Sequence, residues 1–263
     1  MRIHRVYCKS LSQHNEIFQL DEPQSHHLIK ALRIKENDIV EVFDGLGNVA
    51  NCLVLELRNK ICSLKRTENL KKDGKPKNLI TGIIPIIKKN NFNFMLQKMT
   101  EIGVNRFLIY QPDNIDQSVA KKDKSIFLEK SKEIVISVCK QCGNNFLPKI
   151  ESYIHLQSAV DELQKDDQIF AFDTEASKYF AQDELDVTKN ITIITGPESG
   201  FSEKELNILR QDNVMIRFLG KNILRSETAP IVVAGIIKNH FGKNKIMGRV
   251  GRGWFAALSL PVG

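Results

Sequence analysis

Residues 191–200 read ITIITGPESG, and residues 214–229 read VMIRFLGKNILRSETA. Each stretch begins with an apolar, β-branched run, turns through glycine and continues into a sequence with helical character. In an α/β protein, loops of this kind follow parallel strands and build ligand sites from backbone groups at the carboxyl ends of those strands. The two stretches therefore predict an α/β domain with a small-molecule site where the loops meet.

The composition restricts the class of protein. The chain has 263 residues and a formal net charge of +7, so it can form one large domain or two modest ones, and it favours a polyanionic partner such as nucleic acid. The five cysteines are odd in number and scattered, which favours a reducing compartment. The amino terminus lacks a signal-like apolar core and no apolar run is long enough to span a bilayer, so we predict a cytoplasmic protein with no membrane partner.

Residues 1–72 are predicted to form a β-rich domain. Residues 39–43 and 49–57 are β-branched, partly alternating runs, and the turn sequence DGLGN at residues 44–48 predicts a hairpin between them. Residues 25–33 predict a short helix beside this sheet. The polar segment KKDGKPK at residues 71–77 marks the domain boundary, and its lysines fit a solvated linker better than an RNA contact.

Residues 73–243 alternate between strand-like and helix-like patterns, which predicts parallel strands joined by helical crossovers. The strand patterns lie at residues 79–87, 107–110, 169–172, 191–194 and 214–219. Two helix faces are marked by Phe92, Met95, Leu96 and Met99, which precede a C-cap at Gly103, and by Phe127, Ser131, Ile134 and Val138. Residues 244–263 differ in character, and we assign them no function.

Three short motifs need separate interpretation. The sequence SEKE at residues 202–205 is a capping box and predicts a helix that begins near Glu203. The sequence GLGNVA at residues 45–50 matches a dinucleotide fingerprint, but a strand follows it instead of a helix, so we reject that function. The sequence CKQC at residues 139–142 lies in a helical pattern with no second cysteine pair and no nearby histidine, so we predict no metal site.

The loop residues predict the kind of ligand. Gly196 and Gly200 allow backbone N–H and C=O groups to face outward at the end of the strand. Glu198 would repel phosphate, and the Gly-Lys-Ser/Thr of a phosphate-binding loop is absent, so a cationic or zwitterionic nucleoside fits better. Residues 219–220 and 223–224 of the second loop form an apolar cradle whose backbone can read a purine edge.

Arg225 and Glu227 lie between this cradle and the next helix, whose start Ser226 or Thr228 can cap. Two interpretations stay open for the charged residues. Either they act on a bound substrate, or they pair with each other and only brace the loop.

These residues resemble the ribosomal RNA small subunit methyltransferase E family, in the SPOUT class of α/β-knotted methyltransferases. Its pattern runs GPEGG and then LGxxILRxETA; this chain has GPESG at residues 196–200, where Ser199 replaces a glycine, and LGKNILRSETA at residues 219–229. QKMTEIGV at residues 97–104 is similar to a helix of the family, and residues 27–33 and 42–45 are similar to its amino-terminal PUA-like RNA-binding domain. The similarity runs from residue 1 to about residue 243, although Gln117 stands in a segment that carries arginine in the family.

The resemblance implies a fold, a reaction and a set of partners. The fold is a trefoil-knotted α/β domain with a mostly parallel sheet, and the protein is a homodimer. The methyl donor is S-adenosylmethionine, and the acceptor is N3 of a uridine in 16S rRNA, either free or in the assembled small ribosomal subunit. The implied cofactor site consists of Thr195, Gly196, Pro197, Gly200, Leu219, Gly220, Ile223, Leu224, Thr228 and Ala229.

Methylation at N3 of uracil removes a proton and spreads negative charge over the flanking carbonyl oxygens. We therefore predict that Arg225 stabilises this charge and that Glu227 or Glu198 accepts the proton. The candidate RNA contacts are Arg5, His26, His27, Arg33 and Lys98.

Three other functions stay open at this stage. A SPOUT methyltransferase with another RNA target, such as a ribose 2′-hydroxyl, usually has a last loop resembling SLNVS, whereas this chain has ILRSETA. A non-catalytic RNA-binding factor would keep the same fold. A Rossmann-type methyltransferase has little support, because the one glycine-rich match is the hairpin turn.

Overall fold

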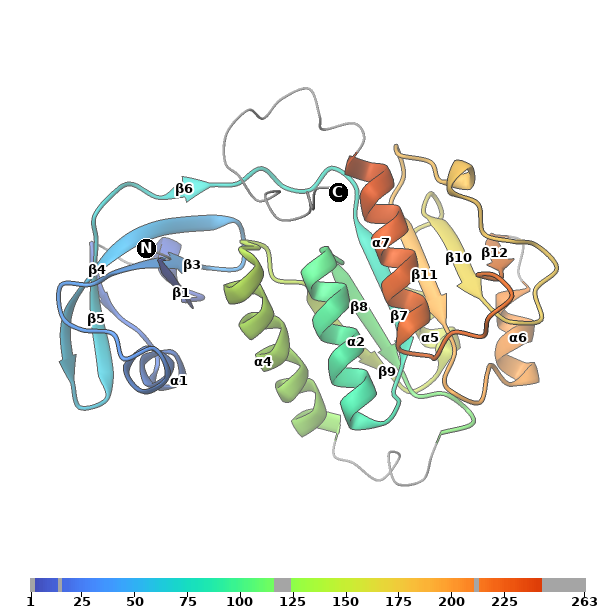
Figure 1. Ribbon diagram of the computed structural model, residues 1–263, viewed down its shortest axis with the longest axis horizontal. Coiled ribbons are helices and arrows are strands. Elements are labelled where there is room, and N and C mark those ends of the chain that lie inside the picture. The colour runs from blue at the N-terminus through green and yellow to red at the C-terminus, as the bar shows by residue number, and fades with distance from the viewer. Residues whose placement is uncertain (1–2, 14–15, 116–123, 211–212, 243–263) are drawn as a thin grey trace, which may run out of the picture.

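The computed structural model describes residues 3–13, 16–115, 124–210 and 213–242. The predictions for Gln117 and for the tail at residues 244–263 lie outside these ranges. The described strands form two six-stranded sheets, one from the amino-terminal residues and one from the rest of the chain (Figure 1).

The first sheet has the strand order β1-β3-β4-β5-β2, with β6 paired to β4. The β1–β3 pair is parallel and the other pairs are antiparallel. The predicted hairpin between β3 and β4 is confirmed, and its turn is held by Asp44 Oδ1, which accepts the backbone N–H groups of Leu46 (2.7 Å) and Asn48 (3.1 Å). The strands are β1 (His4–Tyr7), β2 (Ile17–Gln19), β3 (Ile39–Phe43), β4 (Asn48–Arg58), β5 (Ile61–Arg66) and β6 (Lys71–Lys72).

Short helical segments cover this sheet, namely η1 (Leu11–Gln13), α1 (Glu22–His26) and η2 (His27–Ala31). The helix predicted at residues 25–33 begins earlier, because Asp21 caps α1 by accepting the backbone N–H of Gln24 at 2.8 Å. The linker predicted at residues 71–77 is shorter than expected, because Lys71 and Lys72 form β6 and pair with β4. A closed apolar core lies inside, including Val6, Leu28, Val40, Val54 and Leu64.

The second sheet is entirely parallel and has the order β12-β10-β11-β7-β8-β9. From β7 the chain adds β8 and β9 on one side, and then places β10, β11 and β12 on the other side. This confirms the predicted α/β arrangement and brings the carboxyl ends of three late strands together. The strands are β7 (Ile80–Pro85), β8 (Arg106–Tyr110), β9 (Lys149–Tyr153), β10 (Gln168–Phe172), β11 (Ile191–Thr195) and β12 (Val214–Arg217).

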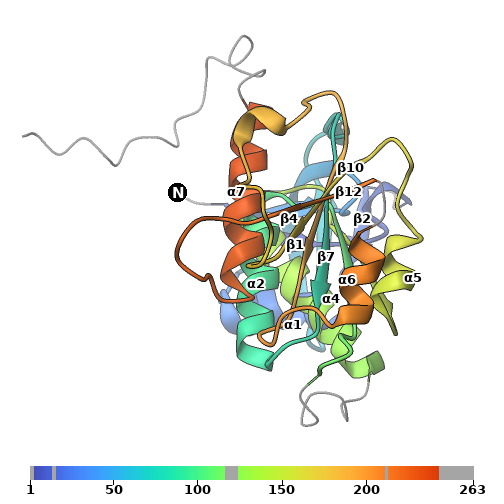
Figure 2. The same cartoon turned by 90° about the vertical axis from the view of Figure 1, so that its right-hand side faces the viewer.

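Helices cover both faces of this sheet (Figure 2). On one face lie α2 (Lys89–Ile102), α4 (Lys124–Cys142) and α7 (Thr228–Gly242), and on the other lie α5 (Leu156–Val160) and α6 (Glu203–Leu209). The buried pair Ile193 and Ile194 contributes to the two opposite cores, as a strand covered on both faces requires. The short segment η3 (Gln182–Glu184) follows β10. The predicted C-cap of α2 is confirmed, with Gly103 at a φ of 101°.

The hairpin turn of the first sheet joins the second sheet's domain directly. Leu46 forms a β-bridge with Phe146, Gly47 N–H donates to Asn145 O at 2.9 Å, and Leu147 N–H donates to Gly45 O at 2.9 Å. Gly47 has a φ of +98°, and a Cβ there would lie 2.5 Å from the Phe146 ring. The glycine-rich turn is therefore a packing contact, which explains why it has the glycines of a dinucleotide fingerprint without the following helix.

Arg5 lies in the same junction, and its contacts there do not support its predicted role as an RNA contact. The side chain is only 11% exposed, its Nε is 2.5 Å from Glu41 Oε1, and its Nη1 donates to Cys139 O at 2.7 Å. The third guanidinium nitrogen donates to Asn145, and the guanidinium carbon lies 4.6 Å from the centre of the Phe43 ring. Each nitrogen of Arg5 makes a hydrogen bond within the chain, and two of these bonds, to Cys139 and Asn145, join the two parts of the chain.

The five cysteines are all free thiols, and only Cys142 is exposed. Burial raises the pKa of Cys52 to about 12 and that of Cys62 to about 11. At the end of α4, by contrast, a hydrogen bond from the Cys139 thiol lowers the pKa of Cys142, with a smaller contribution from the Arg5 guanidinium.

We expect iodoacetamide at neutral pH to alkylate Cys142 before any other cysteine, because the thiolate is the reactive form and Cys142 keeps it to lower pH. The rate of labelling at Cys142 should fall as the pH is lowered through the pKa of its thiol, because the thiol then becomes protonated. Peptide mass spectrometry of the folded protein measures the rate at each cysteine, and Cys142→Ser is the control. Faster labelling of a buried cysteine would contradict the structure.

Among the helices in the described parts of the chain, none is both long enough and apolar enough to cross a membrane.

Candidate active site

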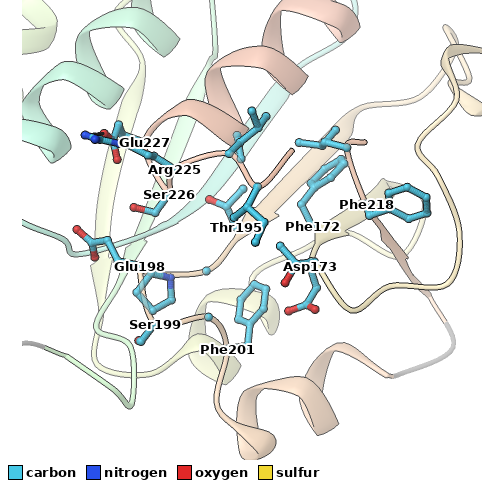
Figure 3. Close-up of a pocket in the computed structure, with 18 of the residues that line it drawn as sticks. Phe172, Asp173, Thr195, Glu198, Ser199, Phe201, Phe218, Arg225, Ser226 and Glu227 are labelled. Carbon is cyan, nitrogen blue, oxygen red and sulfur yellow. Dashed lines mark ion pairs between the residues drawn. The ribbon is translucent and has the colours of Figure 1, made fainter. Parts of the chain in front are cut away.

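A cavity of about 740 Å³ lies at the carboxyl ends of β10, β11 and β12. Both loops quoted at the outset form its walls, as do the residues after β10 and the first turn of α2 (Figure 3). Its lining includes all but one of the predicted cofactor-binding residues, namely Thr195, Gly196, Pro197, Gly200, Leu219, Gly220, Ile223, Leu224 and Ala229. Thr228 is the exception, because it starts α7 and is not part of the lining.

The first loop is a rigid turn between β11 and α6. Gly200 has a φ of +75°, and its N–H donates to Pro197 O at 3.0 Å. The predicted capping box is confirmed: Ser202 Oγ accepts Glu205 N–H at 3.1 Å, and Glu205 Oε2 accepts Ser202 N–H at 2.8 Å. The turn therefore presents residues 196–199 to the cavity from a fixed strand end and a fixed helix start.

The second loop lies between β12 and α7. Gly220 has a φ of +123°, a conformation that side chains rarely adopt, and Ile223 is 81% exposed at the rim of the cavity. Arg225 O accepts the N–H groups of Thr228 (2.9 Å) and Ala229 (3.1 Å), so the backbone of Arg225 closes the first turn of α7. Of the two caps predicted for this helix, Ser226 is not one, because Ser226 Oγ is buried and has no hydrogen-bond partner among the described residues. Thr228, the other candidate, is the first residue of α7 itself.

Arg225 and Glu227 lie on the same side of the cavity as Glu198, as Figure 3 shows. Arg225 Nη1 is 3.9 Å from Glu227 Oε1; the arginine side chain is 82% exposed, and that of the glutamate is 9% exposed. Glu227 Oε2 is buried and has no hydrogen-bond partner within the described ranges. At 3.9 Å the contact between Arg225 and Glu227 is weak. If the two residues only braced the loop, Glu227 Oε2 and most of the Arg225 guanidinium would have no role.

Further polar groups of the cavity also lack partners. Thr195 Oγ1 and Ser226 Oγ are buried without a hydrogen bond to any residue that the structure describes, and both residues line the cavity. Buried polar atoms are normally paired in native proteins, so unpaired ones that line a cavity indicate a ligand that supplies the missing partner. The predicted residues are thus brought together around a cavity lined by buried polar atoms that are able to bind a polar ligand.

Several lining residues were missed by the sequence analysis. Phe172 ends β10, Asp173 and Glu175 follow it, and Lys88 and Asn91 come from the start of α2. The end of β10 was visible as a strand end, but the order of strands that places it beside β11 was not. Arg217 also lines the cavity, but its Nη2 forms an ion pair with Glu184 Oε2 at 2.5 Å. Hydrogen bonding from Arg217 lowers the pKa of Glu184.

The remaining candidate RNA contacts are spread over the molecule. His26 and Arg33 are exposed in the part of the chain that forms the first sheet. His27 is half-buried, and burial, followed by the nearby charge of Lys140, lowers its pKa, so it stays neutral to lower pH. Lys98 lies on α2 and pairs with Glu101 at 2.9 Å. No group of three or more His, Cys, Asp or Glu side chains suited to a metal ion occurs in the described part of the chain.

Comparison with known proteins gives a consistent family. Residues 75–238 match the RNA methyltransferase domain, and residues 20–65 match the RNA methyltransferase PUA domain. Ribosomal RNA small subunit methyltransferase E of Buchnera aphidicola subsp. Acyrthosiphon pisum is 28% identical over 93% of this chain and 96% of its own length.

Two solved structures share the fold. A putative methyltransferase from Legionella pneumophila, solved with S-adenosylmethionine, has a TM-score of 0.81 at 22% identity over 91% of this chain and 98% of its own. Ribosomal RNA small subunit methyltransferase E of Neisseria gonorrhoeae, bound to S-adenosylmethionine, has a TM-score of 0.78 at 24% identity over 90% of this chain and 98% of its own. The chain therefore belongs to the RNA methyltransferase family that includes the ribosomal RNA small subunit methyltransferase E proteins, which confirms the resemblance drawn from its two loops.

Proposed function

We propose that this protein transfers a methyl group from S-adenosylmethionine to N3 of a specific uridine in 16S rRNA of the small ribosomal subunit. The observation that carries the proposal is the cavity at the meeting of the two loops, where buried Glu227 has an unpaired oxygen and Arg225 is exposed beside it. The names of the full-length relatives supply the class of substrate.

The residues present fit S-adenosylmethionine, which when bound supplies an electrophilic methyl group. Four carboxylates line the cavity and suit a ligand with sulfonium and ammonium charges, namely Asp173, Glu175, Glu198 and Glu227. Apolar side chains that suit an adenine ring are Phe172, Phe201, Leu219 and Leu224. The unpaired hydroxyls of Thr195 and Ser226 offer the hydrogen bonds that such a polar ligand completes.

We assign the proton chemistry to the charged side of the cavity. Glu227 takes the proton from N3 of the uracil, so that the N–H bond breaks and its electron pair stays on N3 for the new N–CH₃ bond. Arg225 lies beside Glu227, and its exposed guanidinium stabilises the negative charge that develops on the uracil carbonyl oxygens. Glu198 is the alternative proton acceptor, and it is exposed at the rim.

We further propose the finer architecture that the family resemblance implies. Residues 1–72 form the PUA-like RNA-binding domain, residues 73–243 form the methyltransferase domain, and the two loops form a trefoil knot. The protein acts as a homodimer in the cytoplasm. His26 and Arg33, both exposed on the first domain, are the proposed RNA contacts there.

The deciding experiment compares 16S rRNA from cells with and without this gene by mass spectrometry of nuclease fragments. We expect one fragment to lose the mass of a methyl group, and the modified nucleoside to be N3-methyluridine. The purified protein is also expected to bind S-adenosylmethionine in a calorimetric titration. An unchanged N3-methyluridine signal would refute the substrate, and absence of cofactor binding would favour a non-catalytic RNA-binding factor.

A further inference from the structure

A second cavity of about 440 Å³ adjoins the first. The two cavities share Lys88 and the turn formed by Pro197, Glu198 and Ser199, so this turn is the wall between them. The second cavity opens between the first loop and the segments that follow β7 and β8, and its other lining residues are Ile86, Ile87, Pro112, Asn114 and Ile115. A volume of this size is in the range of small-ligand sites.

The walls of the second cavity are held in place by hydrogen bonds across the loops. Ser202 Oγ donates to Asp113 Oδ2 at 2.7 Å, and Asp113 N–H donates to Glu205 Oε1 at 3.2 Å. Ser199 Oγ donates to Asn114 O at 3.4 Å, so the residue that replaces the family glycine adds one more link. The segment after β8 is therefore fixed against the first loop, because Asp113 is hydrogen-bonded to both Ser202 and Glu205 at the start of α6.

The chemistry of the lining suits one flat, neutral heterocycle. Five residues give apolar walls, namely Ile86, Ile87, Pro112, Ile115 and Pro197. Asn114 supplies an amide with both a donor and an acceptor group. Enzymes that act on a nucleobase take it out of the stack, hold it between apolar side chains and read its edge by hydrogen bonds. Glu198 lines both cavities, so a base held in the second cavity lies next to the charged side of the first.

We propose that the second cavity receives the acceptor uracil after it leaves the RNA stack, and that Asn114 reads its edge. This inference rests on the proposed function and goes beyond it by naming the cavity that holds the acceptor uracil. The amide N–H of Asn114 donates to a carbonyl oxygen of uracil, which leaves N3 directed past Glu198 towards the first cavity. Lys88 lies on the rim shared by both cavities and neutralises the phosphate of the same nucleotide.

The test uses two substitutions at Asn114, which is exposed and lines the second cavity but not the first. Asn114→Trp fills the cavity, and Asn114→Ala removes only the amide. The control is Asn213→Ala, at an exposed asparagine that lines neither cavity. Small subunits isolated from cells lacking the gene serve as substrate, and calorimetry with S-adenosylmethionine is run on each variant.

We expect Asn114→Ala to raise KM for the subunits about tenfold, the effect of one lost hydrogen bond to the base. We expect Asn114→Trp to reduce kcat/KM at least about 100-fold, because the base no longer has a place. S-adenosylmethionine affinity should change less than about twofold in both variants, and Asn213→Ala should match the native protein.

Normal turnover by Asn114→Trp would overturn the base cavity while leaving the proposed function intact. A loss of cofactor affinity as large as the loss of turnover would also overturn it, since the two cavities would then be one site. If the native protein methylates no subunit at all, the proposed function fails, and this inference fails with it.

Discussion

Arg225→Ala is expected to slow methyl transfer about 100-fold while leaving the affinity for S-adenosylmethionine nearly unchanged. The arginine side chain is 82% exposed and contacts Glu227 only at 3.9 Å, so its removal creates no cavity in the core. Its loss matters when negative charge develops on the uracil carbonyl oxygens. The effect should therefore appear in kcat, because the guanidinium stabilises the transition state more than the bound substrate.

The measurement is single-turnover methyl transfer to small subunits from cells lacking the gene, with calorimetry of the cofactor on the same variant. Arg210→Ala is the matched control, because Arg210 is an exposed arginine at the end of α6 that does not line the cavity. Arg225→Lys should recover part of the rate, since it restores the charge without the planar fork. A normal rate for Arg225→Ala would leave bracing of the loop as its function.

Local signals in the sequence predicted the parts of the site that depend on neighbouring residues. The capping box at residues 202–205 determines where α6 starts, and both of its reciprocal hydrogen bonds form. Glycine at positions 200 and 220 marked turns, and both adopt positive φ. Helical spacing identified Phe92, Met95, Leu96 and Met99, which are all buried. These features could be predicted because each depends on contacts within one or two turns of chain.

The features that were missed depend on contacts between distant segments. Arg5 looked like a free cation, but its partner Asn145 lies 140 residues away along the chain, across the junction. Asp173 lines the cavity because β10 lies beside β11, and periodicity does not encode the order of strands. Ser226 has the residue type of a cap, yet the backbone of Arg225 closes the turn, and the Ser226 hydroxyl stays buried without a hydrogen-bond partner among the described residues.

The same reasoning separates the two candidate proton acceptors. Glu198 is exposed on the turn between the two cavities, where water competes for its hydrogen bonds. Glu227 is buried, and its Oε2 has no partner among the described residues. An unpaired carboxylate oxygen held away from water is ready to accept a proton, whereas a hydrated one must first lose a water molecule. The geometry therefore favours Glu227 over Glu198.

Glu227→Gln is expected to lower kcat about 100- to 1,000-fold at neutral pH, because the amide keeps the shape of the side chain but cannot accept the N3 proton. Glu198→Gln, the matched control at the exposed carboxylate on the same side of the cavity, is expected to retain most of the rate. Thermal unfolding of both variants checks that the fold is intact. The reverse pattern, with loss in Glu198→Gln and a normal rate in Glu227→Gln, would exchange the two roles.

The pH dependence of the variants distinguishes proton acceptance from charge stabilisation. At alkaline pH the N3 proton of uracil leaves to hydroxide in solution, so the reaction no longer needs a carboxylate in the site. We expect the rate of Glu227→Gln to rise with pH towards that of the native protein. Arg225→Ala should show no such recovery, because its missing charge is required after the proton has left. If Glu227→Gln stayed slow at alkaline pH, Glu227 would serve to position Arg225 instead of accepting the proton.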